Sequence, residues 1–176
     1  MNGIVIVDKP QGWTSQDVTA KLRGVFQTRR IGHGGTLDPM ATGVLVIMLG
    51  HCTRFIELLP EHKKSYTARV RLGDTTDTCD ITGTVLTEKS VSVTNEQVIA
   101  VLEKFTGKQK QIPPMFSALK RNGVPLYDLA RKGISVDIPA RDIEVLSLVQ
   151  TSPLDNSNEF DIDVCVSKGT YIRSLC

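Results

Sequence analysis

The chain has few residues of the kinds that mark a secreted, membrane-bound or metal-binding protein. Its 176 residues include only four cysteines, and no two of them form a Cys-x-x-Cys pair. This spacing predicts reduced thiols in a cytoplasmic protein rather than a disulfide framework or a zinc site. The first residues carry neither a basic segment nor a long apolar run, so we expect no signal peptide. No stretch approaches the length of a membrane-spanning helix.

Common cofactor and nucleophile motifs are also missing. The sequence holds no Gly-x-x-x-x-Gly-Lys phosphate loop, no Gly-x-Gly-x-x-Gly, no serine in a nucleophile elbow and no histidine pair at metal-ligand spacing. The Asp- and Thr-rich segment 73–83 superficially resembles a calcium loop, but it lacks the central glycine and the closing glutamate. We expect a hydrogen-bonded loop there, and neither a metal nor a cofactor.

Charge is unevenly distributed along a chain whose net charge is only +2. Residues 104–141 hold eight Lys or Arg and two Asp, whereas residues 142–164 hold six Asp or Glu and no Lys or Arg. Residues 1–71 hold ten Lys or Arg and five Asp or Glu. One basic and one acidic face would suit a polyanion such as nucleic acid, although a solvated surface of uneven charge explains the pattern equally well.

The hydrophobic pattern predicts one α+β unit with a mainly antiparallel sheet flanked by helices and loops. Strands are predicted over six segments: 4–7, 44–49, 66–72, 83–86, 143–148 and 160–166. We expect segment 83–86 to pair as the next strand after 66–72. The polar segment 153–158 predicts a hairpin loop between the last two strands.

Capping signals predict the helices. The first begins at Thr14-Ser15 and has four residues facing inward: Val18, Leu22, Val25 and Phe26. The second begins at a capping box over 94–97, ends at Gly107 and has four residues facing inward: Val98, Val101, Leu102 and Phe105. A short third helix over 126–132 ends at Gly133. A last helix begins near Gly169, and because the chain ends inside it we expect a fragment.

The segment Gly32–Gly43 presents a single carboxylate, Asp38, between glycines and a proline. Pro39 disfavours a helical backbone at Asp38, while Gly34 and Gly35 allow backbone shapes that a side chain would forbid. An apolar strand follows at once, so the loop holds an acid at the edge of a sheet. Locally, two interpretations stay open: a turn in which Asp38 only hydrogen-bonds its neighbours, and a catalytic acid.

Two further segments set aromatic residues among cations. Lys63–Tyr66 places its tyrosine after a basic pair at a strand start, as a stacked base beside phosphates would require, although an ordinary edge-strand tyrosine fits as well. Segment 167–173 ends in Arg173, which would keep Asp38 ionised if it faced that carboxylate, although an arginine there is usually a surface residue. His33 is a lone histidine in a glycine-rich loop, a position more often solvent-facing than functional.

Taken together and in order, seven segments resemble the TruB family of tRNA pseudouridine synthases: Gly3–Pro10, Thr14–Asp17, Gly32–Gly43, Lys63–Tyr66, Gly73–Gly83, Gln111–Arg131 and Ser167–Arg173. The match covers almost the whole chain. The resemblance implies the pseudouridine synthase fold, with residues 1–176 as an incomplete catalytic domain. Members of the family continue well beyond such a C-terminal segment, and they usually add a small RNA-binding (PUA) domain.

The resemblance also implies a role for five residues. Asp38, in Thr-Leu-Asp-Pro, matches the catalytic aspartate. Tyr66 matches the tyrosine that stacks on the target uracil, and Arg173 matches the arginine that pairs with the aspartate. His33 matches a loop histidine that contacts the substrate arm near the extruded nucleotide. Tyr171, in Gly-Thr-Tyr-Ile-Arg, is expected to line the pocket.

The implied activity is isomerisation of uridine to pseudouridine at position 55, in the TΨC arm of tRNA, with the base flipped out and Asp38 as nucleophile or base. We expect a cytoplasmic monomeric enzyme that binds the TΨC stem-loop and uses no cofactor, metal or membrane. Lys9-Pro10 and Lys120 match basic positions on RNA or in structural support. Two alternatives remain: a non-catalytic tRNA-binding or folding module with an incomplete pocket, and an unrelated hydrolase that uses Asp38 as its nucleophile.

Overall fold

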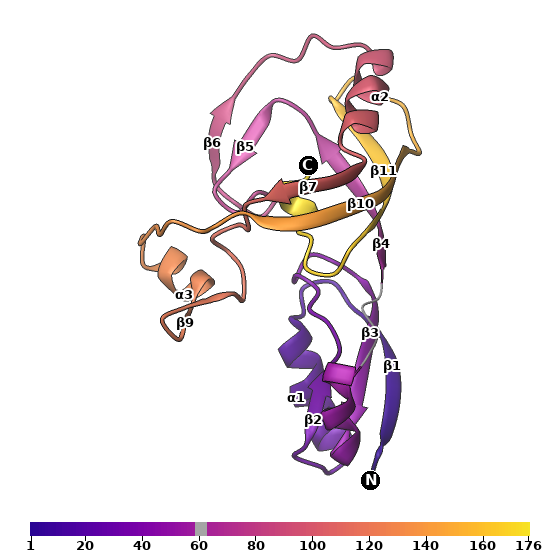
Figure 1. Cartoon of the computed structure of the whole chain (residues 1–176), viewed down its shortest axis with the longest axis vertical. Coiled ribbons are helices and arrows are strands. Elements are labelled where there is room, and N and C mark those ends of the chain that lie inside the picture. The colour runs from indigo at the N-terminus through magenta and orange to yellow at the C-terminus, as the bar shows by residue number, and fades with distance from the viewer. Residues whose placement is uncertain (59–62) are drawn as a thin grey trace. The chain divides into compact units, whose positions relative to one another are not determined.

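The computed structural model describes residues 1–58 and 63–176, which belong to two compact units, Met1–Pro60 and Glu61–Cys176 (Figure 1). Both combine helices with sheets, and every strand pair in the described residues is antiparallel. The predicted α+β class with mainly antiparallel sheets is therefore confirmed. In the described part of the chain, no helix is both long and apolar enough to cross a membrane.

The first unit is built on a three-stranded sheet with β3 (Gly43–Leu49) at its centre. β1 (Gly3–Lys9) pairs along one side of β3, and β2 (Ile31–His33) pairs along the other. Helix α1 (Ser15–Val25) lies between β1 and β2 in the chain, and the 3-10 helix η1 (Gly50–Leu58) follows β3. The two strands predicted for this unit are confirmed.

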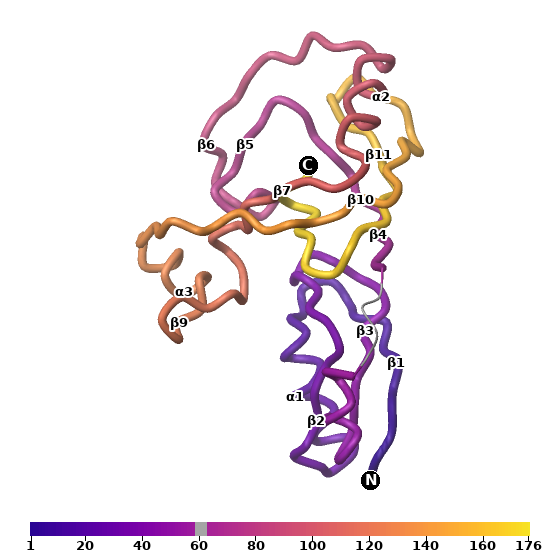
Figure 2. Tube along the Cα trace, viewed as in Figure 1, coloured from indigo at the N-terminus to yellow at the C-terminus, as the bar shows by residue number. Residues whose placement is uncertain are grey.

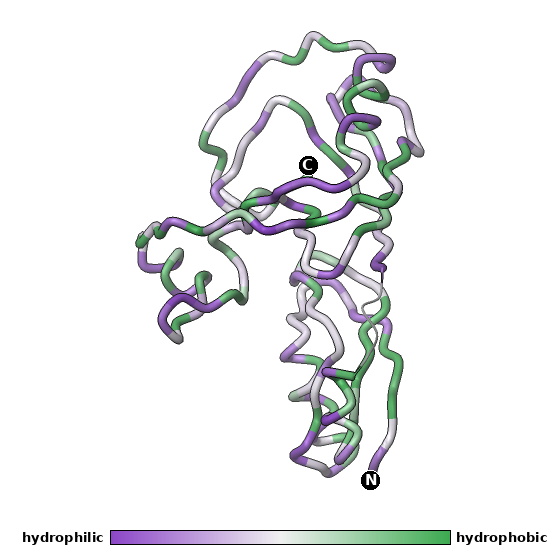
Figure 3. Tube along the Cα trace, in the orientation of Figure 1, coloured by the Kyte–Doolittle hydropathy of each residue, from purple (hydrophilic) through white to green (hydrophobic). Residues whose placement is uncertain are grey.

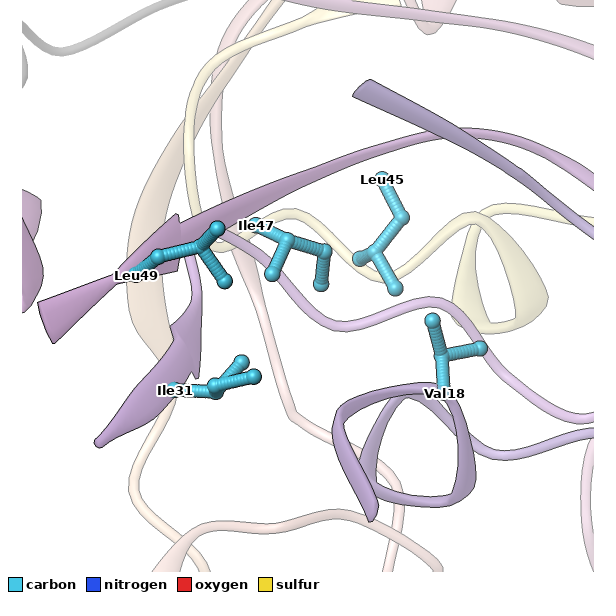
Figure 4. Close-up of a cluster of buried hydrophobic side chains, with 5 residues drawn as sticks. All are labelled: Val18, Ile31, Leu45, Ile47 and Leu49. Carbon is cyan, nitrogen blue, oxygen red and sulfur yellow. The ribbon is translucent and has the colours of Figure 1, made fainter. Parts of the chain in front are cut away.

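The core of the first unit forms on one side of β3. Leu45, Ile47 and Leu49 alternate along the strand and point toward Ile31 and Val18 (Figure 4). All five are buried. The three residues of β3 lie on one side of the sheet because alternate residues of a strand project from the same face. Figure 3 shows β3 as a largely hydrophobic stretch of the trace. This packing fixes α1 and β2 against the strand into which the Asp38 loop leads.

Helix α1 begins at the predicted cap. The Asp17 N–H donates to the Thr14 hydroxyl (3.0 Å), and the Thr14 N–H donates to the Asp17 carboxylate (2.8 Å). Leu22 and Phe26 pack against the core, as predicted. Val25 is 60% exposed, so the prediction that it faces inward is wrong. Consecutive helical residues point about 100° apart, and Phe26 takes the direction toward the core.

The second unit is built on a four-stranded sheet in the order β4-β11-β10-β7. Its strands are β4 (Lys64–Arg71), β7 (Gly107–Gln111), β10 (Arg141–Gln150) and β11 (Glu159–Val166). Three of them were predicted, as was the hairpin between β10 and β11. The strand β7 was not predicted, because its sequence Gly-Lys-Gln-Lys-Gln has no apolar residue to reveal a period of two.

One face of this sheet is apolar. Its buried residues lie on three strands: Val70, Ile143, Val145, Phe160, Ile162, Val164 and Val166. Helix α2 (Asn95–Lys104) covers part of this face through Val98 and Leu102, and it has the predicted capping box at Thr94. Val101 and Phe105 are exposed, so their predicted inward orientation is wrong; α2 meets the sheet along the narrower stripe of residues 98 and 102.

The segment after β4 forms its own hairpin. β5 (Asp74–Thr76) pairs with β6 (Val85–Glu88), so the prediction that residues 83–86 pair with the strand over 66–72 is wrong. Between them, the Asp80 carboxylate accepts hydrogen bonds from the Thr82 N–H (2.9 Å) and the Thr78 hydroxyl (2.9 Å). The predicted hydrogen-bonded loop over 73–83 is confirmed.

After β7 the chain leaves the sheet and returns to it as β10 (Figure 2). In between, β8 (Lys120–Arg121) and β9 (Val124–Pro125) form a short hairpin closed by Asn122-Gly123, both with positive φ, a turn that this dipeptide favours. The predicted third helix is α3 (Leu126–Arg131). At the end of the chain, the predicted helix start is one 3-10 turn, η2 (Ile172–Ser174).

Charged residues of the main sheet pair across strands. Arg69 on β4 lies 2.8 Å from Asp161 on β11, and Lys110 on β7 lies 3.1 Å from Asp142 on β10. On these strands the two pairs fit the second of the two interpretations, a solvated surface of uneven charge. The sheet order explains this result, because the acidic strands β10 and β11 lie between the basic strands β4 and β7.

Candidate functional site

Asp38 lies in the loop that connects β2 to the central strand β3. Its carbonyl oxygen accepts a hydrogen bond from the Ala41 N–H (3.0 Å), which closes a tight turn around Pro39. The Pro39 carbonyl in turn accepts from the Gly12 N–H (2.7 Å). In the described part of this loop the positive φ is at Gly43 (115°) and not at the two glycines that precede Asp38. The special backbone conformation therefore lies at the entrance to β3, where glycine is favoured.

The residue before Asp38 is held by a buried serine. The Leu37 N–H donates to the Ser15 hydroxyl oxygen (3.0 Å), and the Ser15 hydroxyl donates to the Leu37 carbonyl oxygen (3.3 Å). Ser15 is the first residue of α1 and is 3% exposed. Both backbone groups of Leu37 are thus tied to α1, which fixes the backbone position from which the Asp38 side chain projects.

A buried lysine supports the same loop from the end of β1. The Lys9 ammonium donates to the carbonyls of Trp13 (2.6 Å), Pro10 (2.9 Å) and Pro39 (3.4 Å). Burial lowers the pKa of Lys9 below its usual range, while the carboxylates of Asp38 and Asp17 act in the opposite direction. Lys9 therefore links β1, the turn before α1 and the residue after Asp38 through one cation.

His33 ends β2, just before the Asp38 loop. Its Nδ1 lies 2.6 Å from the Gly35 carbonyl oxygen. A carbonyl oxygen can only accept, so Nδ1 carries the proton of this hydrogen bond and donates. The ring is partly exposed, and its orientation is set by the loop itself.

Tyr66, Tyr171 and Arg173 belong to the second unit. Tyr66 lies on β4 opposite Val164 of β11, and its ring packs against the buried cluster that includes Val145 and Val166. Its position among the core-facing residues of β4 agrees with the predicted alternation. The ring is only partly buried, so one part of it packs on the cluster and another part stays accessible.

Tyr171 is held through its backbone by the side chain of Gln111. The Gln111 amide nitrogen donates to the Tyr171 carbonyl (2.9 Å), and the Tyr171 N–H donates to the Gln111 amide oxygen (2.8 Å). Gln111 is buried at the end of β7. The paired bonds fix the chain where it enters η2.

Arg173 is held by groups from two distant segments. Its guanidinium donates to the carbonyls of Thr78 and Phe116, both at 2.9 Å, and lies 3.5 Å from the Asp80 carboxylate. The Arg173 and Asp80 side chains are 12% and 9% exposed. Burial raises the pKa of Asp80, but the hydrogen bonds from Thr82 and Thr78 and the charge of Arg173 outweigh it, so the pKa lies below its ordinary value.

The five predicted site residues thus divide between the two units. His33 and Asp38 lie on one loop region of the first unit, and Tyr66, Tyr171 and Arg173 lie in the second. Ile172, between the last two, packs on the same cluster as Tyr66. The pairing of Asp38 with Arg173 involves one residue from each unit and stays a prediction. In the described ranges, no group of three or more His, Cys, Asp or Glu residues could hold a metal.

Sequence reasoning did not assign a role in the candidate site to Ser15, Asp80 or Gln111. Ser15 was identified only as a capping residue, and Asp80 only as part of a hydrogen-bonded loop. A glutamine at the buried end of a polar strand gives no signal in composition or charge. The one sign that the sequence offers is that all three residues fall inside segments that carry the family resemblance.

Residues 23–172 match the family described as "TruB family pseudouridylate synthase (N terminal domain)". Curated relatives with the name tRNA pseudouridine synthase B include those of Clostridium perfringens (strain 13 / Type A), 46% identical over 100% of this chain, and Oceanobacillus iheyensis, 47% identical over 100% of it. The protein from Lactococcus lactis subsp. cremoris (strain MG1363) is 46% identical over 99% of the chain. The chain spans 60%, 59% and 55% of these relatives' lengths.

Two solved structures have the same fold. A Cbf5-Nop10-Gar1 complex contains a chain that is 29% identical, with a TM-score of 0.72, and the match covers 98% of this chain and 42% of that one. An H/ACA RNP bound to a substrate RNA containing 2'-deoxyuridine contains another, 26% identical with a TM-score of 0.68, and the match covers 98% and 40%. The predicted pseudouridine synthase fold and family resemblance are confirmed, and the chain belongs to the TruB family of pseudouridylate synthases, to whose N-terminal domain it corresponds.

Proposed function

We propose that this chain carries the main catalytic side chains of an isomerase that converts uridine to pseudouridine at position 55, in the TΨC arm of tRNA. The observation that carries the proposal is the Asp38 loop. One carboxylate stands in Thr-Leu-Asp-Pro with its backbone tied on both sides, through Leu37 to Ser15 and through Pro39 to Gly12. Such support suits a side chain that must meet a substrate in one orientation. In this proposal residues 1–176 act as part of one catalytic domain.

The chemistry needs a carboxylate and a pocket for a detached base. The N1–C1′ bond of uridine breaks, the uracil turns, and C5 bonds to C1′; the proton lost from C5 is balanced by the proton gained at N1. Asp38 serves as nucleophile or as base during this exchange. A uridine within a folded arm must leave its stack before a side chain can reach it.

The other predicted residues bind and orient the substrate in this proposal. Tyr66 stacks on the flipped uracil from a ring supported by the sheet core. Arg173, with its guanidinium already oriented by two carbonyls, pairs with Asp38 and keeps it ionised. His33 contacts the RNA arm beside the extruded nucleotide, and Tyr171 lines the pocket.

The relatives' name, tRNA pseudouridine synthase B, supports tRNA as the partner. The basic segment over 104–141 supports the same partner, since its lysines and arginines can contact phosphates. Affinity that comes from such contacts decreases as the salt concentration rises. We propose that the chain acts as a cytoplasmic monomer on the TΨC stem-loop.

The test is to incubate the chain with a TΨC stem-loop RNA and to detect pseudouridine by chemical mass-tagging. We expect product from the wild-type chain, none from Asp38→Asn, and RNA affinity within about threefold in both. Asp8→Asn, which changes an exposed carboxylate on β1, is the matched control and should keep full turnover. Salt-dependent binding without product from the wild type would overturn the proposal in favour of a non-catalytic tRNA-binding module.

A further inference from the structure

We propose that Gln111 is a positioning residue for the proposed isomerisation: its side-chain amide holds the backbone of Tyr171 and thereby orients Arg173. This inference rests on the proposed function and adds a residue that neither touches the substrate nor carries charge.

The geometry of the Gln111 amide restricts the backbone of Tyr171. Gln111 is 8% exposed, and both of its polar groups are used on a single partner residue, at 2.9 Å and 2.8 Å. Two bonds between one amide and both backbone groups of Tyr171 resemble one step of a strand pair. They fix the direction of the chain as well as its distance, because neither bond survives a rotation of the Tyr171 backbone.

The segment that follows Gln111 also contacts the side chain of Arg173. Five residues after Gln111, the Phe116 carbonyl accepts a hydrogen bond from the Arg173 guanidinium (2.9 Å). One stretch of chain therefore holds the backbone of residue 171 at one end and the side chain of residue 173 at the other. Loss of the Gln111 bonds would free the entrance to η2 and change the angle from which Arg173 reaches its carbonyl partners.

The residue type at position 111 points to the same role. Gln111 and Gln109 lie on the core-facing side of β7. An apolar side chain would be expected at the buried position 111. A buried amide costs free energy unless its groups are paired, so packing alone does not favour glutamine here. Gln109 instead donates to the Phe105 carbonyl at the end of α2 (2.6 Å). It lies on the same strand, makes no bond to η2, and is a matched control.

Two substitutions separate the two bonds. Gln111→Met keeps the length of the side chain but removes both hydrogen bonds to Tyr171. Gln111→Glu keeps the acceptor for the Tyr171 N–H and replaces the donor with a carboxylate oxygen that faces the Tyr171 carbonyl. Gln109→Met and Gln109→Glu make the same chemical changes two residues earlier. Urea unfolding of all four variants identifies any that fail to fold.

The first measurement does not depend on activity. Amide hydrogen exchange followed by NMR on the whole chain should show the Tyr171 N–H exchanging about tenfold faster in Gln111→Met, since its buried partner is lost. In Gln111→Glu its exchange should stay within about threefold of the wild type, whereas the Arg173 side-chain signal should shift in both variants. Neither Gln109 variant should change these signals.

The second measurement is turnover on the TΨC stem-loop. We expect kcat to fall about tenfold in both Gln111 variants, with KM within about twofold, because RNA contacts remain while Arg173 is misaligned. A folded Gln111→Met chain with wild-type exchange at Tyr171, or a loss of kcat shared equally by the Gln109 variants, would overturn the inference. Should Gln111→Met fail to fold, an unshifted Arg173 signal and unchanged kcat in Gln111→Glu would overturn it instead. Absence of product from the wild type would overturn the proposed function, while the exchange data still decide whether Gln111 holds Tyr171.

Discussion

Arg173 and Asp80 form a nearly buried ion pair, with the guanidinium nitrogen 3.5 Å from the carboxylate oxygen. Asp80 is itself fixed by Thr78 and Thr82, and the Thr78 carbonyl accepts a hydrogen bond from Arg173. The β5–β6 hairpin therefore sets the orientation of the arginine at the end of the chain. The guanidinium of Arg173 is therefore already oriented for the role that we propose for it.

We expect Asp80→Asn to lower the free energy of unfolding by about 1–3 kcal/mol, because it removes the carboxylate charge from a largely buried pair. Urea denaturation followed by circular dichroism measures this loss. Asp77→Asn is the control, since Asp77 lies in the same hairpin and its carboxylate accepts a bond from the Thr84 N–H. An equal loss in the two variants would show that the pair with Arg173 adds nothing of its own.

The same pair predicts a dependence of stability on pH. The pKa of Asp80 is lower in the folded chain than its ordinary value of 3.8, so its ionised form stabilises folding. That contribution is complete above the unfolded pKa and is lost as the pH falls through the lower folded pKa. The difference in unfolding free energy between the wild type and Asp80→Asn should therefore shrink as the pH falls below about 4. A difference that stays constant from pH 6 to pH 2 would contradict this prediction.

Lys9 gives a prediction for the first unit. We expect Lys9→Met to lower the free energy of unfolding by about 2–4 kcal/mol, because it leaves the carbonyls around the ammonium without their charged donor. Trp13, the only tryptophan of the chain, carries one of the carbonyls that accept a hydrogen bond from Lys9, and its fluorescence reports the unfolding of this unit. Lys21→Met, at an exposed position of α1, should change stability by less than about 0.5 kcal/mol. Losses of similar size in the two variants would refute the structural role of Lys9.

Local signals in the sequence predicted most of the secondary structure. The N-cap predicted at Thr14-Ser15 and the capping box predicted at Thr94 are both present, because the residues that form a cap lie within four positions of one another. Strand pairing was predicted less well. Of the segment 83–86, residues 85 and 86 lie in β6, which pairs with β5 and not with β4, since the choice of partner depends on the path of the chain and not on local propensity.

The sequence marks a candidate site residue where a motif surrounds it, and it gives no sign where only a contact partner in the fold defines the residue's role. Asp38 and Arg173 stand in recognisable segments. Ser15 and Gln111, in contrast, act through bonds to residues 22 and 60 positions away in the chain. Neutral polar residues of this kind acquire their role from the fold, and neither charge nor periodicity distinguishes them from ordinary loop and strand residues.

A last prediction concerns the support for the Asp38 loop. Ile47 is fully buried at the centre of β3, four residues after Gly43 brings the loop into the sheet. We expect Ile47→Ala to lower the free energy of unfolding by about 2–5 kcal/mol, because the surrounding core cannot fully close the cavity.

Ile6→Ala is the matched control on the neighbouring strand. Ile6 is 62% exposed, and its truncation should cost less than about 1 kcal/mol. Urea unfolding monitored by Trp13 fluorescence compares the two. If Ile47→Ala also speeds amide exchange at Ala41, whose N–H donates to the Asp38 carbonyl, then the core of this unit holds the loop in its functional shape. Unchanged exchange at Ala41 in a destabilised Ile47→Ala chain would instead assign that role to Ser15 and Lys9 alone.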